Sequence, residues 1–110
     1  MESGYKALVK AFWQTYRPTA LAELAQTTPP ETFFAQMGAE IEEQIAERRD
    51  EFREETPPGA DFRDAMASIN MATMRSREAV LHELVYSLAK EPGTEDAEMP
   101  RVSLPKIAAG

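Results

Sequence analysis

Glu78 and His82 lie four residues apart in "REAVLHEL", a spacing that puts both side chains on one face of a helix. They could supply two ligands to a metal ion, but a zinc site needs at least a third. The chain has no other histidine and no cysteine, and di-iron helix bundles use a three-residue Glu-to-His spacing. We therefore expect neither a metal site nor a cofactor, with His82 at or near the surface.

No set of residues in the sequence matches a catalytic site. It contains no Gly-rich phosphate loop, no Ser, His and Asp in a workable order, and no paired acids at a predicted cleft. The absence of cysteine also excludes disulfides and a thiolate nucleophile. We expect a protein that is not an enzyme.

Four polar residues, Arg48, Asn70, Arg77 and Glu78, fall on or beside the apolar faces of predicted helices. On a helical wheel centred on Leu81, Asn70 and Arg77 lie within about 40° of the apolar face. An unpaired guanidinium is costly to bury, so Arg77 needs a carboxylate or carbonyl partner, or a cleft open to water. Its candidate carboxylates are Glu23, Glu51, Glu55 and Glu78. Two interpretations stay open: a structural network that fixes helix register, which is the commoner arrangement, and a groove in which Arg48 and Arg77 bind an anion.

Helices must position these residues, and the first helix is predicted near the N-terminus. Apolar residues recur at three- and four-residue intervals from Tyr5 to Tyr16, and Ser3 can cap this stretch. Pro18 interrupts the pattern, because proline lacks a backbone donor and disfavours helical dihedrals at the preceding residue. The helix should therefore kink or restart there.

Two longer helices should follow. Thr28 and Glu31 fit a capping box around two prolines, which predicts a helix that runs to about Glu55. After the break "TPPGAD", Asp61 can cap a last helix over residues 62–90. The apolar faces of these two helices should form the core, with Phe34, Met37, Ile41, Ile45, Phe52, Met66, Met74, Leu81, Leu84, Val85 and Leu88.

The last twenty residues, "EPGTEDAEMPRVSLPKIAAG", have three prolines, two glycines and no periodicity. They are predicted to be a disordered or loosely docked tail. We expect an all-α fold, a small bundle of three to four helices over residues 1–90, followed by a flexible acidic, proline-containing tail over 91–110.

Charge narrows the range of partners. Among 110 residues, 19 are Asp or Glu and 12 are Lys or Arg, which gives a net charge of −7. Direct nucleic-acid binding is not expected, because phosphate contacts need a basic face. No run approaches the roughly 18 apolar residues of a membrane span, and "MESGYKALVK" lacks the apolar core of a signal peptide. The expected location is the cytoplasm, without a membrane partner.

The segment "INMATMRSREAVLHELVYSL" resembles the C-terminal signature of the TnpV family, small proteins encoded on bacterial transposons and integrative elements. The matching positions are Asn70, Arg75 or Arg77, Glu78, Leu81, His82, Glu83, Leu84 and Tyr86. "FWQTYRPTALAEL" resembles the family's aromatic-rich helix, with Arg17 and Pro18 at its Arg-Pro, and a long acidic helix lies between the two segments. The resemblance covers about Lys6 to Leu88, while the family's N-terminal extension is missing and the tail is extra. It implies a mobile-element context and an accessory role in excision or transfer, without an established activity.

These observations lead to a non-enzymatic protein-interaction protein of a bacterial mobile element. It would bind a protein partner through a helical face or its tail, and an exposed apolar or Met-rich patch is the expected sign. Self-association as a homodimer is a further option, because long amphipathic helices leave apolar surface to cover.

Two alternatives remain. An acidic inhibitor of a nucleic-acid enzyme, such as a host-defence restriction or CRISPR nuclease, would carry carboxylates in rows along one face. Arginines at positions 48, 49 and 53 interrupt the acidic helix and count against it. A small DNA-binding excision factor would instead need a local basic patch. The arginines available for such a patch are Arg49, Arg53, Arg63 and Arg75.

Overall fold

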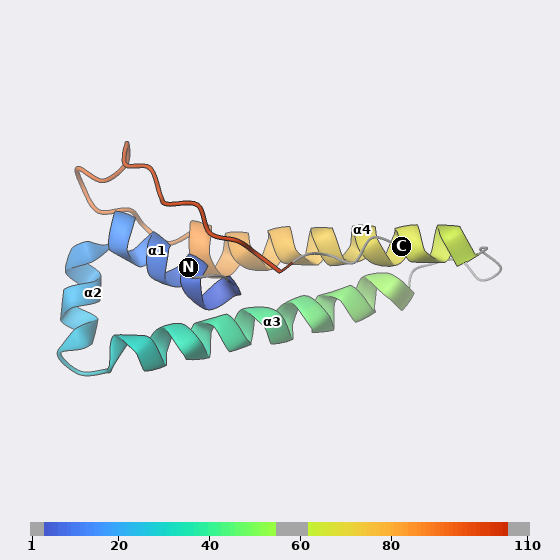
Figure 1. The fold of residues 1–110 in the computed structure, drawn as a ribbon, viewed down its shortest axis with the longest axis horizontal. Helices are drawn as coiled ribbons and strands as arrows, with labels where there is room; N and C mark the ends of the chain where they lie inside the picture. Colours follow the sequence, from blue (N-terminus) through green and yellow to red (C-terminus); the bar gives the residue numbers. More distant parts are fainter. Residues whose placement is uncertain (1–3, 55–61, 106–110) are drawn as a thin grey trace.

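The computed structural model describes residues 4–54 and 62–105, and its regular elements are four α-helices and one π-helical turn (Figure 1). In chain order they are α1 (Gly4–Tyr16), α2 (Pro18–Ala25), α3 (Pro30–Glu54), α4 (Phe62–Leu81) and the π-helix η1 (His82–Tyr86), which continues α4. The expected all-α class is confirmed. The expected caps at Ser3 and Asp61 lie outside the described residues.

The break between α1 and α2 falls at the predicted proline. Pro18 is the first residue of α2, and Arg17 before it leaves helical dihedrals, with φ −135° and ψ 48°. A proline is well tolerated at a first helical position, because the backbone donor that it lacks has no partner there. The interruption therefore becomes a restart of the helix rather than a kink.

The start of α3 differs from the predicted capping box. In a capping box the Thr28 N–H would donate to the Glu31 carboxylate. It donates instead to the Leu24 carbonyl, at 2.9 Å. The Glu31 carboxylate pairs with Lys6 at 3.0 Å and Lys10 at 3.2 Å, both on α1. Hydrogen bonds from Lys6 and then Lys10 hold the Glu31 pKa below its usual range. Glu31 therefore joins two helices instead of capping its own.

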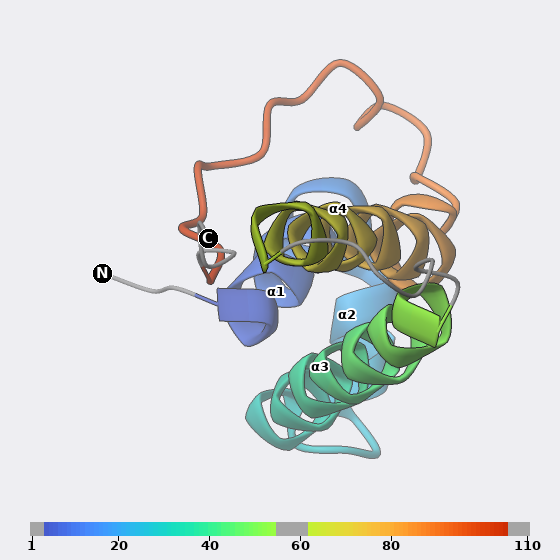
Figure 2. The same ribbon diagram turned by 90° about the vertical axis from the view of Figure 1, so that its right-hand side faces the viewer.

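Helices α3 and α4 run antiparallel as a long hairpin, and α1 and α2 lie beside only one end of it (Figures 1 and 2). The molecule measures 54 × 28 × 26 Å, with a radius of gyration of 16.6 Å. A compact domain of this length has a radius of gyration of about 13 Å. The protein is therefore elongated along the hairpin.

The core forms where α1, α3 and the end of α4 meet. The predicted stripe of α1 is confirmed, with four of its residues buried: Tyr5, Leu8, Val9 and Phe12. Phe34, Ile41 and Ile45 of α3 are buried as expected, and Met37 packs against them. The side chains of Phe52 and Met66 lie outside the described part. At Gly38, a Cβ would lie 2.9 Å from the Lys6 backbone nitrogen, so α1 and α3 approach closely there.

The buried face of α4 differs from the predicted one between Ala72 and Val80, in the second half of the helix. Leu81 and Val85 are buried as expected, but Met74 is 51% exposed. Ala72, Ser76 and Val80 face inward instead. On an ideal wheel, Val80 and Ser76 lie about 100° and 140° from Leu81. The buried Ser76 hydroxyl has a hydrogen-bond partner within its own helix, because it donates to the Ala72 carbonyl at 2.7 Å.

The segment after η1 lies against the bundle as far as Pro105. Glu91 anchors it: its N–H donates to the Tyr16 carbonyl at 2.9 Å, and its carboxylate accepts from the backbone N–H groups of Thr19 and Ala20. The carboxylate thereby satisfies free donors at the N-terminus of α2. The boundary expected at residue 90 thus separates elements that are hydrogen-bonded to each other.

Candidate functional site

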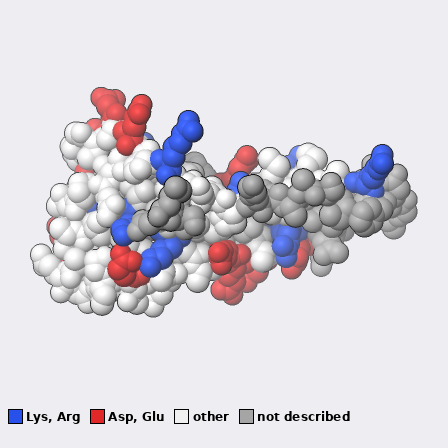
Figure 3. Space-filling view, in the orientation of Figure 1, with Lys and Arg blue, Asp and Glu red and all other residues white. Residues whose placement is uncertain are grey.

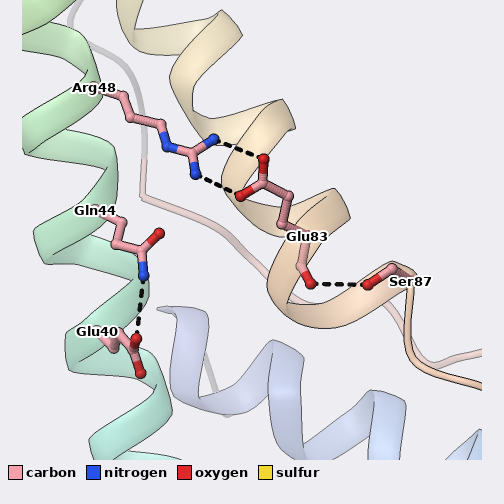
Figure 4. Close-up of polar contacts among 5 residues, drawn as sticks. All are labelled: Glu40, Gln44, Arg48, Glu83 and Ser87. Atoms are coloured by element: carbon pink, nitrogen blue, oxygen red, sulfur yellow. Dashed lines mark hydrogen bonds and ion pairs between the residues drawn. The ribbon is translucent and has the colours of Figure 1, made fainter.

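Arg48 of α3 and Glu83 of η1 form a two-pronged ion pair across the helix hairpin (Figure 4). Nη1 lies 3.1 Å from Oε1 and Nη2 lies 2.5 Å from Oε2. The hydrogen bond from Arg48 lowers the Glu83 pKa, and the same bond raises the Arg48 pKa. Arg48 is therefore neutralised by a residue 35 positions away, which sequence analysis did not identify as its partner.

The π-helical turn holds the Glu83 backbone. The Ser87 N–H donates to the His82 carbonyl, five residues back, at 2.8 Å. The Ser87 hydroxyl donates to the Glu83 carbonyl at 2.8 Å (Figure 4). In an α-helix the Ser87 N–H would donate to this carbonyl, but in the π-helical turn it donates to His82 instead. Single π turns within α-helices are frequent at functional sites. The turn has the sequence "HELVY".

Arg77 is half-buried and faces the C-terminal segment rather than α3. Its Nη1 donates to the Pro105 carbonyl at 2.7 Å, so a carbonyl, not one of the expected glutamates, is its acceptor. Asn70 is half-buried and Glu78 is exposed. Within the described part, no hydrogen bond or ion pair joins Arg48, Asn70, Arg77 and Glu78 to one another. The structure therefore places Arg48 beside Glu83 and Arg77 beside Pro105, at two separate sites.

An aromatic pocket of about 230 Å³ lies between the end of α1, η1 and the C-terminal segment. Its lining is Phe12, Tyr16, Tyr86, Lys90 and Met99. Lys90 places its Nζ 4.2 Å from the centre of the Tyr16 ring, a cation–π contact. Burial raises the pKa of the Tyr86 hydroxyl, and the charge of Arg77 partly offsets this effect. The pocket carries no recognisable catalytic set.

Two methionines stand out on the surface of α4. Met71 is 54% exposed and Met74 is 51% exposed, and they lie one turn apart on the side away from Ala72 and Ser76. Tyr86 of η1 is 46% exposed. We call Met71 and Met74 the methionine face. It matches the Met-rich patch expected of an interaction protein, although the sequence had assigned Met74 to the core.

The outward face of α3 is acidic (Figure 3). Five of its exposed acids lie within about 80° of Glu40 on an ideal wheel, whereas the exposed Glu42 lies about 160° away. The five are Glu40, Glu43, Glu47, Asp50 and Glu51. We call these five residues the acidic row. Arg48 and Arg49 lie about 80° and 180° from Glu40 on the same wheel, and Arg49 pairs with Asp50 of the row at 3.6 Å. Arg49 therefore interrupts the row at Asp50, and Arg48 borders it. The Arg53 side chain lies outside the described part.

Three other kinds of site can be checked in the described residues: a metal site, a basic patch and a membrane span. His82 is exposed, and among residues 4–54 and 62–105 no three His, Cys, Asp or Glu side chains are placed to hold a metal ion. Arg63 and Arg75 are separated by about 18 Å along α4, at 1.5 Å per residue, so they do not form one patch. None of the helices in the described part is long and apolar enough to cross a membrane.

Comparisons with family models, curated proteins and solved structures found no match to this chain. Functional inference therefore rests on the sequence and geometry of the chain itself.

Proposed function

We propose that this chain is a non-enzymatic protein-interaction protein that binds its partner through the methionine face of α4. The exposure of Met71 and Met74 carries the proposal. Fully burying a methionine side chain contributes about 1.5–3 kcal/mol, so a partner that covers both gains a substantial part of its affinity there. Methionine also adapts its shape to a binding partner, because its side chain is unbranched and polarisable.

The biological setting of the proposal comes from the sequence. Met71 and Met74 lie inside the TnpV-like segment, which supports an accessory role in a bacterial mobile element, in the cytoplasm. The absence of a recognisable catalytic set in the aromatic pocket supports a role without catalysis. A partner protein that acts on the element, or on the host's response to it, fits this setting.

Affinity capture with matched variants tests the proposal. We expect nuclease-treated host lysate to yield a protein partner with the wild-type chain and with Ala35→Ser/Ala39→Ser, which changes exposed positions of α3. Met71→Ser/Met74→Ser should lose that partner while keeping the wild-type helical circular dichroism. The same partner retained by the methionine variant would contradict the proposal.

A second candidate function is supported by the acidic row. Four of its members, Glu40, Glu43, Glu47 and Glu51, follow one another at about 4.5–6 Å along the helix axis. A row of carboxylates at this spacing supports an inhibitor that replaces the phosphates of a nucleic acid in the binding channel of an enzyme.

Charge-neutralising variants separate this candidate from the first one. If it is correct, Glu43→Gln/Glu47→Gln/Glu51→Gln loses the partner, and so does the wild-type chain in high salt. Asp96→Asn/Glu98→Gln, at exposed positions of the C-terminal segment, serves as the charge control. Capture that survives both the triple variant and high salt excludes this function.

A further inference from the structure

The surface of α1 and α4 that holds the segment Ala97–Pro105 has the chemistry of a peptide-binding groove. The segment contains no helical residue and runs beside α1 toward Arg77 (Figures 1 and 2). The bundle contacts it through backbone carbonyls. Three donors each lie 2.7 Å from their acceptor: the Tyr16 hydroxyl to Ala97, the Gly4 N–H to Ser103, and Arg77 Nη1 to Pro105.

The apolar side chains of this segment supply its remaining contacts. Met99, Val102 and Leu104 are half-buried and pack against the core, whereas Glu98 and Arg101 between and beside them are exposed. Recognition of carbonyls together with apolar side chains at fixed intervals is how proteins bind extended peptides. The groove therefore selects for an extended backbone and for apolar residues at the spacing 99, 102 and 104.

The chain after η1 contains an anchor, residues 89–96, and an arm, residues 97–105. The anchor is held by Glu91 against α1 and α2, by the Thr94 hydroxyl on the Tyr16 carbonyl at 3.2 Å, and by Arg17 on the Ala89 carbonyl. Gly93 within it has φ +88°, a value that glycine adopts without strain. The Glu91 cap on α2 involves no residue of the arm, Ala97–Pro105.

We propose that this groove is a binding site for an extended segment of a partner protein, and that Ala97–Pro105 is its intramolecular occupant. The partner segment carries apolar residues with the spacing of Met99, Val102 and Leu104. This inference goes beyond the proposed function, because the groove is a binding surface other than the methionine face. Because Met99 lines the aromatic pocket with Phe12 and Tyr86, displacement of the arm also opens that pocket.

A labelled peptide with the sequence of residues 95–105 tests the groove in the full-length chain. In the wild type the arm competes with the peptide at an effective concentration on the order of 1 mM. For a peptide that binds with a Kd of about 100 μM, releasing the arm tightens apparent binding about tenfold. We expect this gain, measured by fluorescence anisotropy, in Met99→Ser/Val102→Ser/Leu104→Ser.

The matched control is Glu98→Ser/Arg101→Ser, which changes the same segment at exposed positions and should bind the peptide as weakly as the wild type. A peptide with serine at the three apolar positions should bind neither variant. Equal peptide binding by the wild type and a folded release variant would overturn the proposal.

Competition in the wild type needs no release variant. Millimolar peptide should move the Met99 methyl resonance toward its position in the free segment, and an unmoved resonance at saturating peptide would overturn the proposal. Met71→Ser/Met74→Ser should leave peptide binding unchanged. A failed lysate capture with intact peptide binding therefore refutes the methionine face and leaves the groove standing, whereas the reverse result refutes the groove alone.

Discussion

Replacing Gly38 with alanine should destabilise this protein, although Gly→Ala at an open helix position stabilises by about 1 kcal/mol. The added Cβ would lie 2.9 Å from the backbone nitrogen of Lys6 and 3.1 Å from its Cα. Forcing a methyl into a packed site costs about 1–3 kcal/mol, and the upper part of this range applies because backbone atoms cannot rotate away. The expected net loss is about 1–2 kcal/mol.

Thermal and urea unfolding, followed by circular dichroism at 222 nm, measure this change. A loss of this size lowers the Tm by roughly 5–15 °C in a domain of about 100 residues. Ala39→Gly, at the exposed neighbouring position, calibrates the intrinsic helix effect and should cost about 1 kcal/mol. If Gly38→Ala stabilises the protein by the amount that Ala39→Gly costs, the close approach of α1 and α3 is refuted.

Three further outcomes follow from the same structure. Val80→Ala should lower the free energy of unfolding by about 2 kcal/mol and Met74→Ala by at most about 0.5, measured in urea, because Val80 is fully buried and Met74 is half exposed; equal costs would contradict this buried face of α4. Because Arg48 lowers the Glu83 pKa, their pair stabilises the fold above pH 4.5 and loses this contribution as the pH falls through 4.5 to the folded-state pKa. Glu83→Gln should therefore lower the Tm more at pH 6 than at pH 3, and a constant difference would argue against the pair. The Tyr86 hydroxyl should titrate above pH 10.0 in a ¹³C NMR titration, and Arg77→Gln should raise that pKa further; an unchanged pKa in the variant would show that the guanidinium lies elsewhere.

The features that depend on local sequence could be predicted. The stripe from Tyr5 to Tyr16 defines α1, and Pro18 restarts the chain as α2, because both effects act within a few residues. The bounds predicted for α3 and the start of α4 also agree with the structure, since prolines and glycine mark the break between them. Local patterns therefore give the helices and the fold class.

The features that depend on packing could not be predicted. An ideal wheel centred on Leu81 assumes one partner surface along α4, but the small residues Ala72 and Ser76 in the second half of the helix face inward, and this leaves Met74 at the surface. Arg48 and Glu83 meet only because α3 and α4 fold back on each other. The sequence offered one unused signal: the apolar residues of the tail, which pack against the core.

Site-specific photocrosslinking in host cells tests the central claim most directly. A photoreactive amino acid at position 74 would lie on the methionine face, and one at position 47 would lie in the acidic row of α3. We predict a crosslinked protein partner from position 74 and none from position 47. Crosslinks from position 47 alone would contradict the methionine face as the binding surface and would favour the acidic inhibitor.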